Sequence, residues 1–280
     1  MSDRDRDDLA ARARSLLHER LDARLGERLR RDGPRPRDGA GWVDVSAHDL
    51  ELRCPARWSV PFDDFVLSVR TAAGAVGRLA LRERREGEPV GVAVARVAAG
   101  LADADPSVAW FASWYDQELD RSGQAALRAA ATTWAHGALA AVGGRSLNWA
   151  TARQPHDVDG RTVRLRTSWD ASSRGARPEV LVVLSTRPPG DPAAARLAGF
   201  NALVDGLVRR RVPDRVRVAS AATASSAAFP VSMDLLEPVI DRVVELVGWR
   251  VDSDSAPTVP GRWCADCHLL GICPAAPEFP

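Results

Sequence analysis

The fold is decided near the end of the chain, by the stretch Gly261-Arg262-Trp263-Cys264-Ala265-Asp266-Cys267-His268-Leu269-Leu270-Gly271-Ile272-Cys273-Pro274. Three of the four cysteines of the chain lie in it, with the spacing Cys-x2-Cys-x5-Cys. The fourth, Cys54, lies far upstream. If all four thiols bind one centre, that centre ties the beginning of the fold to its end.

The four thiols predict a metal centre. Thiolates are soft ligands that favour an iron–sulfur cluster or zinc, and a set of four satisfies either. Structural zinc usually takes its cysteines as two short knuckles, whereas here one close pair is joined by a third cysteine and a remote fourth. The spacing therefore favours a [4Fe-4S] cluster, with zinc as the alternative, on the ligands Cys54, Cys264, Cys267 and Cys273.

Disulfides or free thiols are the remaining alternative for these cysteines. Disulfides require an oxidising compartment, but Met1 is followed by a charged segment with no apolar signal region. The sequence contains no apolar run of 18 residues that is free of charged residues. We therefore expect a soluble, cytoplasmic protein without a membrane segment.

Composition limits the possible functions. With 280 residues, the chain can bury a core as one large domain or one domain with an inserted lobe. A formal charge of +1 excludes a globally basic nucleic-acid binder and leaves room for a local basic face. All 38 basic residues are arginine, so no mechanism that needs a lysine ammonium operates in this chain.

The first 40 residues read as a charged helix and a linker. Apolar residues spaced by three and four predict a helix over residues 9–31, which we interpret as a solvated arm rather than a partner-binding helix. A Pro/Gly segment then ends it. In the following domain, residues 41–280, Ser46 is expected to cap a short helix that carries Cys54 and Trp58.

Further helices are expected up to residue 142. Residues 66–82 predict a helix in which Gly74 and Gly77 let another element approach closely. Residues 92–142 predict a helical insertion. Its Trp110 and Trp114 are expected in the core, although tryptophan can also stack on bases.

After Gly143-Gly144 the apolar period changes to that of strands. The pattern predicts a meander of three strands followed by a helix, a strand and a helix, over residues 147–152, 163–169, 180–184, 193–211, 215–220 and 234–249. This order predicts an α/β fold with a mixed sheet.

That order, with one cysteine before it and Cys-x2-Cys-x5-Cys after it, resembles the iron–sulfur branch of the PD-(D/E)XK nuclease superfamily. Members include RecB-like single-domain nucleases, the nuclease domains of AddB-type helicase-nucleases and the nucleases of CRISPR spacer acquisition. In these proteins four cysteines hold a [4Fe-4S] cluster that staples the fold, and the first lies in a Cys-Pro-x-x-Trp sequence, here Cys54 to Trp58. The resemblance implies a restriction-endonuclease-like mixed sheet flanked by helices, with the cluster-binding segment at residues 261–276.

The catalytic motifs of the family are altered. Its Gly-x-x-x-His matches Gly74 to Arg78, with arginine in place of the metal-binding histidine. Its Gly-x-x-Asp ends here at Asp170, and its Asp-x-Lys-Thr has Val183 for the carboxylate and Ser185 for the lysine. Because a catalytic Mg²⁺ or Mn²⁺ needs several oxygen ligands, the resemblance implies a vacated site.

Asp170 and other acids of the chain allow two other interpretations. Asp170 is equally a turn residue at a strand end. Alternatively, an active metal-dependent nuclease has a rearranged site built from Asp170, Glu179 and either Asp157 or Asp159.

Arginines suggest how such a fold would hold DNA. Arginine contacts phosphate bidentately, so a cluster on one face would bind DNA without sequence preference. The alternative is that the run after residue 208 complements a helix C-terminus and pairs with nearby acids. The candidate DNA contacts are Arg78, Arg209, Arg210, Arg211 and Arg215.

The sequence thus predicts an iron–sulfur protein with an inactive nuclease fold, acting as a DNA-binding or structural module in DNA repair, processing or defence. The family suggests a helicase or other DNA-processing partner. Besides the active nuclease, the alternative is a redox- or nitric-oxide-sensing DNA-binding regulator. WhiB-like regulators share the cysteine spacing, but their first cysteine lies close to the others.

Overall fold

The structure is a computed structural model, which describes residues 1–26, 43–52, 54–59, 68–100, 109–143, 148–149, 152–158, 162–173, 179–185, 188–190, 192–261, 264, 267, 269 and 273. Its α-helices are α1 (Asp3–Leu25), α2 (Pro55–Ser59), α3 (Val69–Glu83), α4 (Val90–Ala99), α5 (Ala109–Ser113), α6 (Arg121–Val142), α7 (Pro192–Arg209) and α8 (Met233–Val251). A π-helical turn, η5 (Trp114–Glu118), follows α5, and short 3-10 helices are η2 (Asp49–Glu51) and η6 (Ser253–Ser255).

The strands form two mixed sheets. They are β1 (Val43–Ser46), β2 (Ala152–Asp157), β3 (Val163–Trp169), β4 (Ala171–Ser172), β5 (Val180–Ser185), β6 (Arg215–Ser220) and β7 (Ser225–Pro230). One sheet has the order β1-β3-β2 with β1 parallel to β3, and the other has the order β4-β5-β6-β7 with β5 parallel to β6. The mixed α/β class expected from the element order is confirmed.

Asp170 joins the two sheets. It lies between β3 and β4, and its backbone N–H donates to the carbonyl of Val182 in β5 at 2.9 Å. The expected meander is therefore split: β2 and β3 pair in one sheet, while β4 pairs with β5 in the other.

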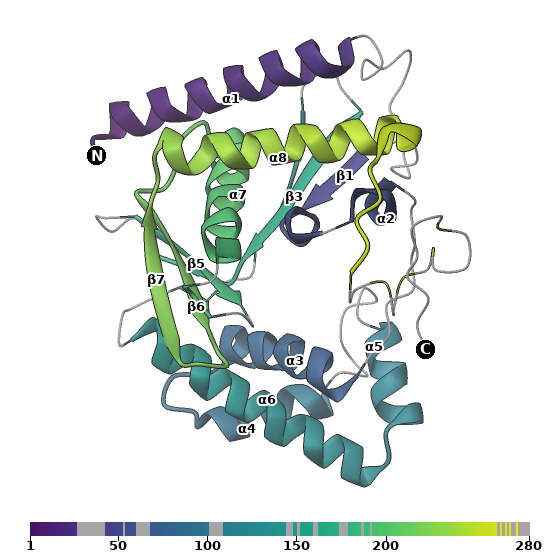
Figure 1. Ribbon diagram of the computed structural model, residues 1–280. Helices are drawn as coiled ribbons and strands as arrows, with labels where there is room; N and C mark the ends of the chain where they lie inside the picture. Colours follow the sequence, from purple (N-terminus) through teal and green to yellow (C-terminus); the bar gives the residue numbers. More distant parts are fainter. Residues whose placement is uncertain are drawn as a thin grey trace.

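Helices cover both sides of the β5–β6 pair (Figure 1). A larger core lies among α1, α7, α8 and the strands, and a smaller core fills the lobe of α3, α4, α5 and α6. Side chains of β5 alternate between them, with Val183 in the larger core and Val182 and Leu184 in the smaller. This double burial explains the continuous apolar run of β5. Among the helices of the described ranges, none combines the length and apolar character that a membrane span requires.

The N-terminal helix is not a solvated arm, and that interpretation is wrong. Helix α1 lies along α8 (Figure 1), and Leu17 and Leu21 are completely buried in the larger core. It begins at Asp3 because the Ser2 side chain caps it by accepting from the Asp5 N–H. The stripe of leucines supplies an apolar face that α8 covers, so α1 belongs to the same core as the domain after residue 40. Residues 27–31 of the expected helix lie outside the described residues.

Three other elements differ from expectation. Ser46 does not cap a helix; it ends β1, and both its N–H and its hydroxyl donate to Asp49 Oδ2, at 2.6 and 2.7 Å. Of the strand expected over residues 147–152, residues 147, 150 and 151 lie outside the described residues, Asn148 forms an isolated bridge with Ser172, and β2 begins at Ala152. Strand β7 was not expected, because its sequence, Ser-Ser-Ala-Ala-Phe-Pro, has neither a long apolar run nor strict alternation.

The expected approach of a second element to Gly77 is confirmed. A Cβ added there would lie 2.5 Å from Cε3 of Trp134, so only glycine lets α6 pack this close to α3. Trp114 is buried in the smaller core, as expected. The side chain of Trp110 lies outside the described part of the structure.

Candidate functional site

Of the four positions that the sequence aligns with the nuclease motifs, the structure brings two, Arg78 and Asp170, into direct contact. Helix α3 presents Arg78 to the junction of β3 and β4, where Arg78 Nε donates to Asp170 Oδ1 at 2.8 Å. The other carboxylate oxygen, Oδ2, accepts the backbone N–H of Leu184 at 2.7 Å. Arg78 Nη2 donates to the carbonyl oxygen of Leu184 at 2.9 Å. Arg78 and Asp170 therefore bond to each other and to the backbone of Leu184 in β5. This arrangement is called the Arg78–Asp170 clasp.

The other two positions add no charge to the clasp. Val183 is buried in the larger core, and because successive residues of a strand face opposite sides, it points away from Leu184 and its neighbours in the smaller core. Ser185 ends β5, and its backbone carbonyl accepts the N–H of Ala221 at 3.3 Å.

Burial and the nearby positive charge shift the pKa of Asp170 in opposite directions. The Asp170 side chain is only 8% exposed and that of Arg78 is 33% exposed. Burial raises the pKa of Asp170 above its usual range, while the positive charge of Arg78 and the Leu184 N–H oppose the rise. Arg78 also lies 4.9 Å from the centre of the Trp134 ring, a cation–π contact that fixes the guanidinium.

The acids proposed for a rearranged site do not gather around Asp170. Glu179 precedes β5 and Leu184 lies near its end, so five residues of strand put them roughly 16 Å apart. Asp157 pairs in register with Arg164, at the end of β3 remote from Trp169. Asp159 lies outside the described residues.

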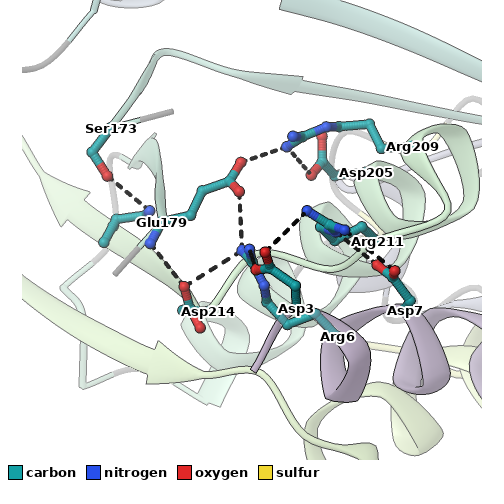
Figure 2. A network of polar contacts seen from close by, with 10 residues as sticks. Asp3, Arg6, Asp7, Ser173, Glu179, Asp205, Arg209, Arg211 and Asp214 are labelled. Atoms are coloured by element: carbon teal, nitrogen blue, oxygen red, sulfur yellow. Dashed lines mark hydrogen bonds and ion pairs between the residues drawn. The ribbon is translucent and has the colours of Figure 1, made fainter. Parts of the chain in front are cut away.

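Glu179 instead joins a network of ion pairs at the other end of β5 (Figure 2). Its carboxylate accepts from Arg6 Nη1 at 3.0 Å and from Arg209 Nη1. Asp214 accepts the Glu179 N–H at 2.8 Å and lies 3.5 Å from Arg6, and Arg209 also reaches Asp205. The network connects α1, α7, β5 and the start of β6.

Two of the candidate DNA contacts belong to this region. Arg209 pairs with Glu179, and Arg211 Nε donates to Asp7 Oδ1 of α1 at 2.6 Å. This agrees with the alternative that these arginines pair with nearby acids. Arg210 and Arg215 are exposed, and within the described ranges neither forms an ion pair.

Sequence reasoning missed Arg6, although its position carried a signal. Arg6 is 6% exposed and precedes Ala10, Ala13 and Leu17 at spacings of four, three and four. An arginine on the apolar stripe of a helix faces the interior, where it needs an acidic partner. Glu179 was weighed only as a metal ligand, because its partner comes from the other end of the chain.

The structure places the Cys54 segment beside the segment that follows α8 (Figure 1). The Ala56 N–H donates to the carbonyl of Pro257 at 3.3 Å, and the Trp58 indole N–H donates to that of Leu246 at 2.8 Å. Cys54 and Cys264 are buried, and the Gly261 N–H points at Cys264 Sγ at 3.4 Å.

The chemistry of four free thiols and this adjacency fit a thiolate centre. The structure does not assemble its coordination sphere, because no three Cys, His, Asp or Glu side chains of the described residues lie close enough to hold a metal ion.

An unpaired arginine lies next to this region. The Arg250 guanidinium is 4.1 Å from the centre of the Trp58 ring, and its Nε is buried with no hydrogen-bond partner among the described residues. Burial lowers the pKa of Arg250 below its usual range, and the carboxylates of Asp49 and Asp44 oppose this shift only at a distance. In the part of the chain that the structure describes, Arg250 forms no ion pair.

No protein-family model matches the chain, and no curated protein matches its sequence. Among solved structures, the crystal structure of SSO0001 is similar with a TM-score of 0.35 and 14% sequence identity, over 94% of this chain and 96% of that chain. A structural similarity this weak does not assign the chain to a family.

Proposed function

We propose that the chain is an iron–sulfur protein with a RecB-like PD-(D/E)XK nuclease fold and a vacated catalytic site, which serves DNA processing as a DNA-binding or structural module. The observation that carries this proposal is the Arg78–Asp170 clasp. The single carboxylate that matches the family motif is bonded to a guanidinium, which comes from the position of the metal-binding histidine.

The clasp opposes metal binding for a physical reason. A divalent ion needs several oxygen ligands and a site of net negative charge. Arg78 already compensates the charge of Asp170, and its own charge repels a second cation. Val183 contributes an aliphatic side chain to the core instead of a carboxylate, and the chain has no lysine to activate water. The clasp is therefore a structural contact between α3 and β5.

Cys54, Cys264, Cys267 and Cys273 are the proposed cluster ligands. A [4Fe-4S] cluster held by these thiols would supply iron–thiolate bonds that cross-link the residue before α2 to the segment after α8. The hydrogen bond from Ala56 to Pro257 holds these two segments together independently of any ligand.

DNA binding is proposed for the exposed arginines at the connection from α7 to β6. Of the five sequence candidates, Arg210 and Arg215 keep their guanidinium groups available for phosphate. Arg78, Arg209 and Arg211 contribute ion pairs that stabilise the fold. A helicase or another DNA-processing protein is the proposed partner, in the cytoplasm.

A cleavage assay tests the vacated site. Single- and double-stranded DNA are incubated with the protein and with the Asp170→Ala variant, in Mg²⁺ and in Mn²⁺. We expect no cleavage by the protein above the level of the variant. Metal-dependent cleavage by the protein that the variant lacks would establish a rearranged nuclease site and overturn the proposal.

Iron analysis tests the cluster independently. Protein purified without oxygen is expected to contain about four irons per chain and to absorb broadly in the visible range. The Cys54→Ala variant is expected to lose both properties. A colourless protein that contains zinc, or a cluster that persists in the Cys54→Ala variant, would remove the strongest part of the family resemblance.

A further inference from the structure

The arginines at the connection from α7 to β6 differ in how firmly acids hold them. Arg209 pairs with Glu179, whose side chain is only 8% exposed. Arg211 pairs with Asp7 of α1, and both side chains are partly exposed, at 36% and 48%. Arg210, between them, is exposed and forms no ion pair within the described ranges. The connection thus carries one buried pair, one surface pair and one unpaired guanidinium group.

The surface pair is supplied by the first turns of α1 (Figure 2). Arg211 Nε and Nη2 donate to the two carboxylate oxygens of Asp7, at 2.6 and 3.2 Å. Asp3 lies farther from Arg211, at 3.8 Å, and is itself engaged by Arg6 Nη2 at 2.6 Å. The backbone holds α1 in this place, because the Val212 N–H donates to the carbonyl of Arg6 at 3.4 Å. Asp7 is therefore the main partner of Arg211.

Asp7 occupies the donors that a phosphate group would use. Arginine binds carboxylate and phosphate groups in the same bidentate manner, through two parallel N–H groups. The hydrogen bonds from Arg211 lower the pKa of Asp7 below its usual range, so the competing carboxylate is ionised at neutral pH. Its charge also repels a phosphate that approaches Arg211. Asp7 thus acts against DNA at this arginine in two ways.

The surface pair and the buried pair differ in what one substitution would release. A pair with two exposed partners contributes little to stability, since water and salt screen both charges, so loss of the Asp7 charge frees Arg211 without disturbing the fold. Glu179 pairs with Arg209 and also with Arg6, which is 7% exposed, and breaking such a buried network is strongly destabilising. Of the paired arginines at this connection, Arg211 is the one that can be released.

We propose that α1 limits the affinity of the protein for DNA, because Asp7 withholds Arg211 from the phosphate backbone. This inference rests on the proposed binding of DNA by Arg210 and Arg215. Without the charge of Asp7, Arg211 becomes a third phosphate contact next to Arg210. Residues 3–8 contain four aspartates and two arginines, so the start of α1 opposes DNA rather than adding to its basic surface.

DNA binding by the Asp7→Asn variant tests the inference. Fluorescence anisotropy over a salt series measures the affinity for a labelled duplex and for the same strand alone. The amide keeps the size of the side chain and removes its charge, so at low salt we expect binding to tighten by about threefold or more. The slope of log affinity against log salt should steepen by about 1, the value for one added phosphate contact.

Two further substitutions assign the effect to Arg211. Asp8→Asn is the matched control, because Asp8 is exposed, forms no ion pair within the described ranges and gives the same change in net charge. It is expected to leave the slope unchanged. Arg211→Ala alone should also leave the slope nearly unchanged, and in combination with Asp7→Asn it should abolish the gain. All of these side chains are partly or fully exposed, and thermal unfolding verifies that each variant folds.

The outcomes separate this inference from the proposed function. If the unmodified protein binds DNA and Asp7→Asn behaves like Asp8→Asn, Asp7 does not compete and the inference is wrong, while the proposed binding stands. A slope that falls by about 1 in Arg211→Ala alone would also overturn it, because Arg211 would then already contact phosphate. Binding by Asp7→Asn alone would support the competition. If neither the unmodified protein nor Asp7→Asn binds DNA, the proposed DNA binding fails, and the inference fails with it.

Discussion

At the scale of single residues, Asp170 shows how a buried carboxylate depends on a charged partner. A carboxylate that is 8% exposed pays a large desolvation cost, which raises its pKa. The guanidinium of Arg78, at 2.8 Å, supplies the charge that keeps the ionised form in place. Arg78 and the Leu184 N–H each donate to one of the two carboxylate oxygens, so both oxygens of Asp170 are hydrogen-bonded within the fold.

The clasp predicts a pH-dependent loss of stability in Arg78→Met. Removing one partner of a fully buried pair costs about 3–5 kcal/mol, and because Arg78 is one-third exposed we expect about 2 kcal/mol near neutral pH. A folded-state pKa above the unfolded value means that ionised Asp170 costs stability as pH rises through it. The variant is therefore expected to match the unmodified protein most closely in acid and to fall behind as pH rises.

Urea denaturation at about pH 5 and about pH 8 checks this prediction. Arg82→Met is the matched control one turn along α3, because Arg82 is 44% exposed and, among the described residues, pairs with the adjacent Glu83 alone. It should change the free energy of unfolding by less than about 1 kcal/mol. An equal loss at both pH values in Arg78→Met would contradict the role of the charge.

At the scale of elements, α1 shows how a helix with many charges becomes part of a core. Its apolar stripe packs against α8, while Arg6 at the start of that stripe enters the network around Glu179 (Figure 2). The helix is thus held by leucines along its length and by buried ion pairs at its N-terminal end.

The network predicts that Arg6→Met destabilises the protein by about 3 kcal/mol, because it leaves Glu179 and Asp214 with less compensating charge in a buried site. Arg20→Met, on the same helix, removes ion pairs to the half-exposed Glu237 and Asp241 and should cost less than about 1 kcal/mol. Thermal or urea unfolding of both variants measures the difference. Equal effects would show that the network adds nothing to an ordinary surface pair.

At the scale of the whole molecule, the formal charge of +1 provides no general attraction for DNA. Any binding must come from a local group of arginines whose charge is not already neutralised. The exposed pair Arg210 and Arg215 meets this condition, while Arg209 and Arg211 are held by acids of the network region.

If these two arginines contact phosphates, the Arg210→Ala, Arg215→Ala double variant weakens DNA binding uniformly across sequences. The slope of log affinity against log salt should fall by about 1 for each lost contact. Fluorescence anisotropy over a salt series measures the slope. Arg121→Ala, an exposed arginine at the start of α6, serves as the control. An unchanged slope in the double variant would move the DNA-binding surface elsewhere.

Local patterns in the sequence were sufficient for most elements. The predicted strand over residues 215–220 is β6, and the helices predicted over 66–82 and 234–249 correspond to α3 and α8. These agreements arise because periodicity, caps and glycine positions act over a few residues and are visible in the chain itself. The contact between Arg78 and Asp170 joins residues 92 apart in the chain, and no local pattern predicts it.

The tertiary structure alone decided which side chains are partners. The leucines of α1 required a covering surface that α8 provides from the other end of the chain, and Arg209 forms an ion pair because Glu179 lies beside it. The sequence by itself determined the types of most elements, the set of four thiols and the absence of lysine. Burial and ion pairing depend on residues far apart in sequence, and only folding brings those residues together.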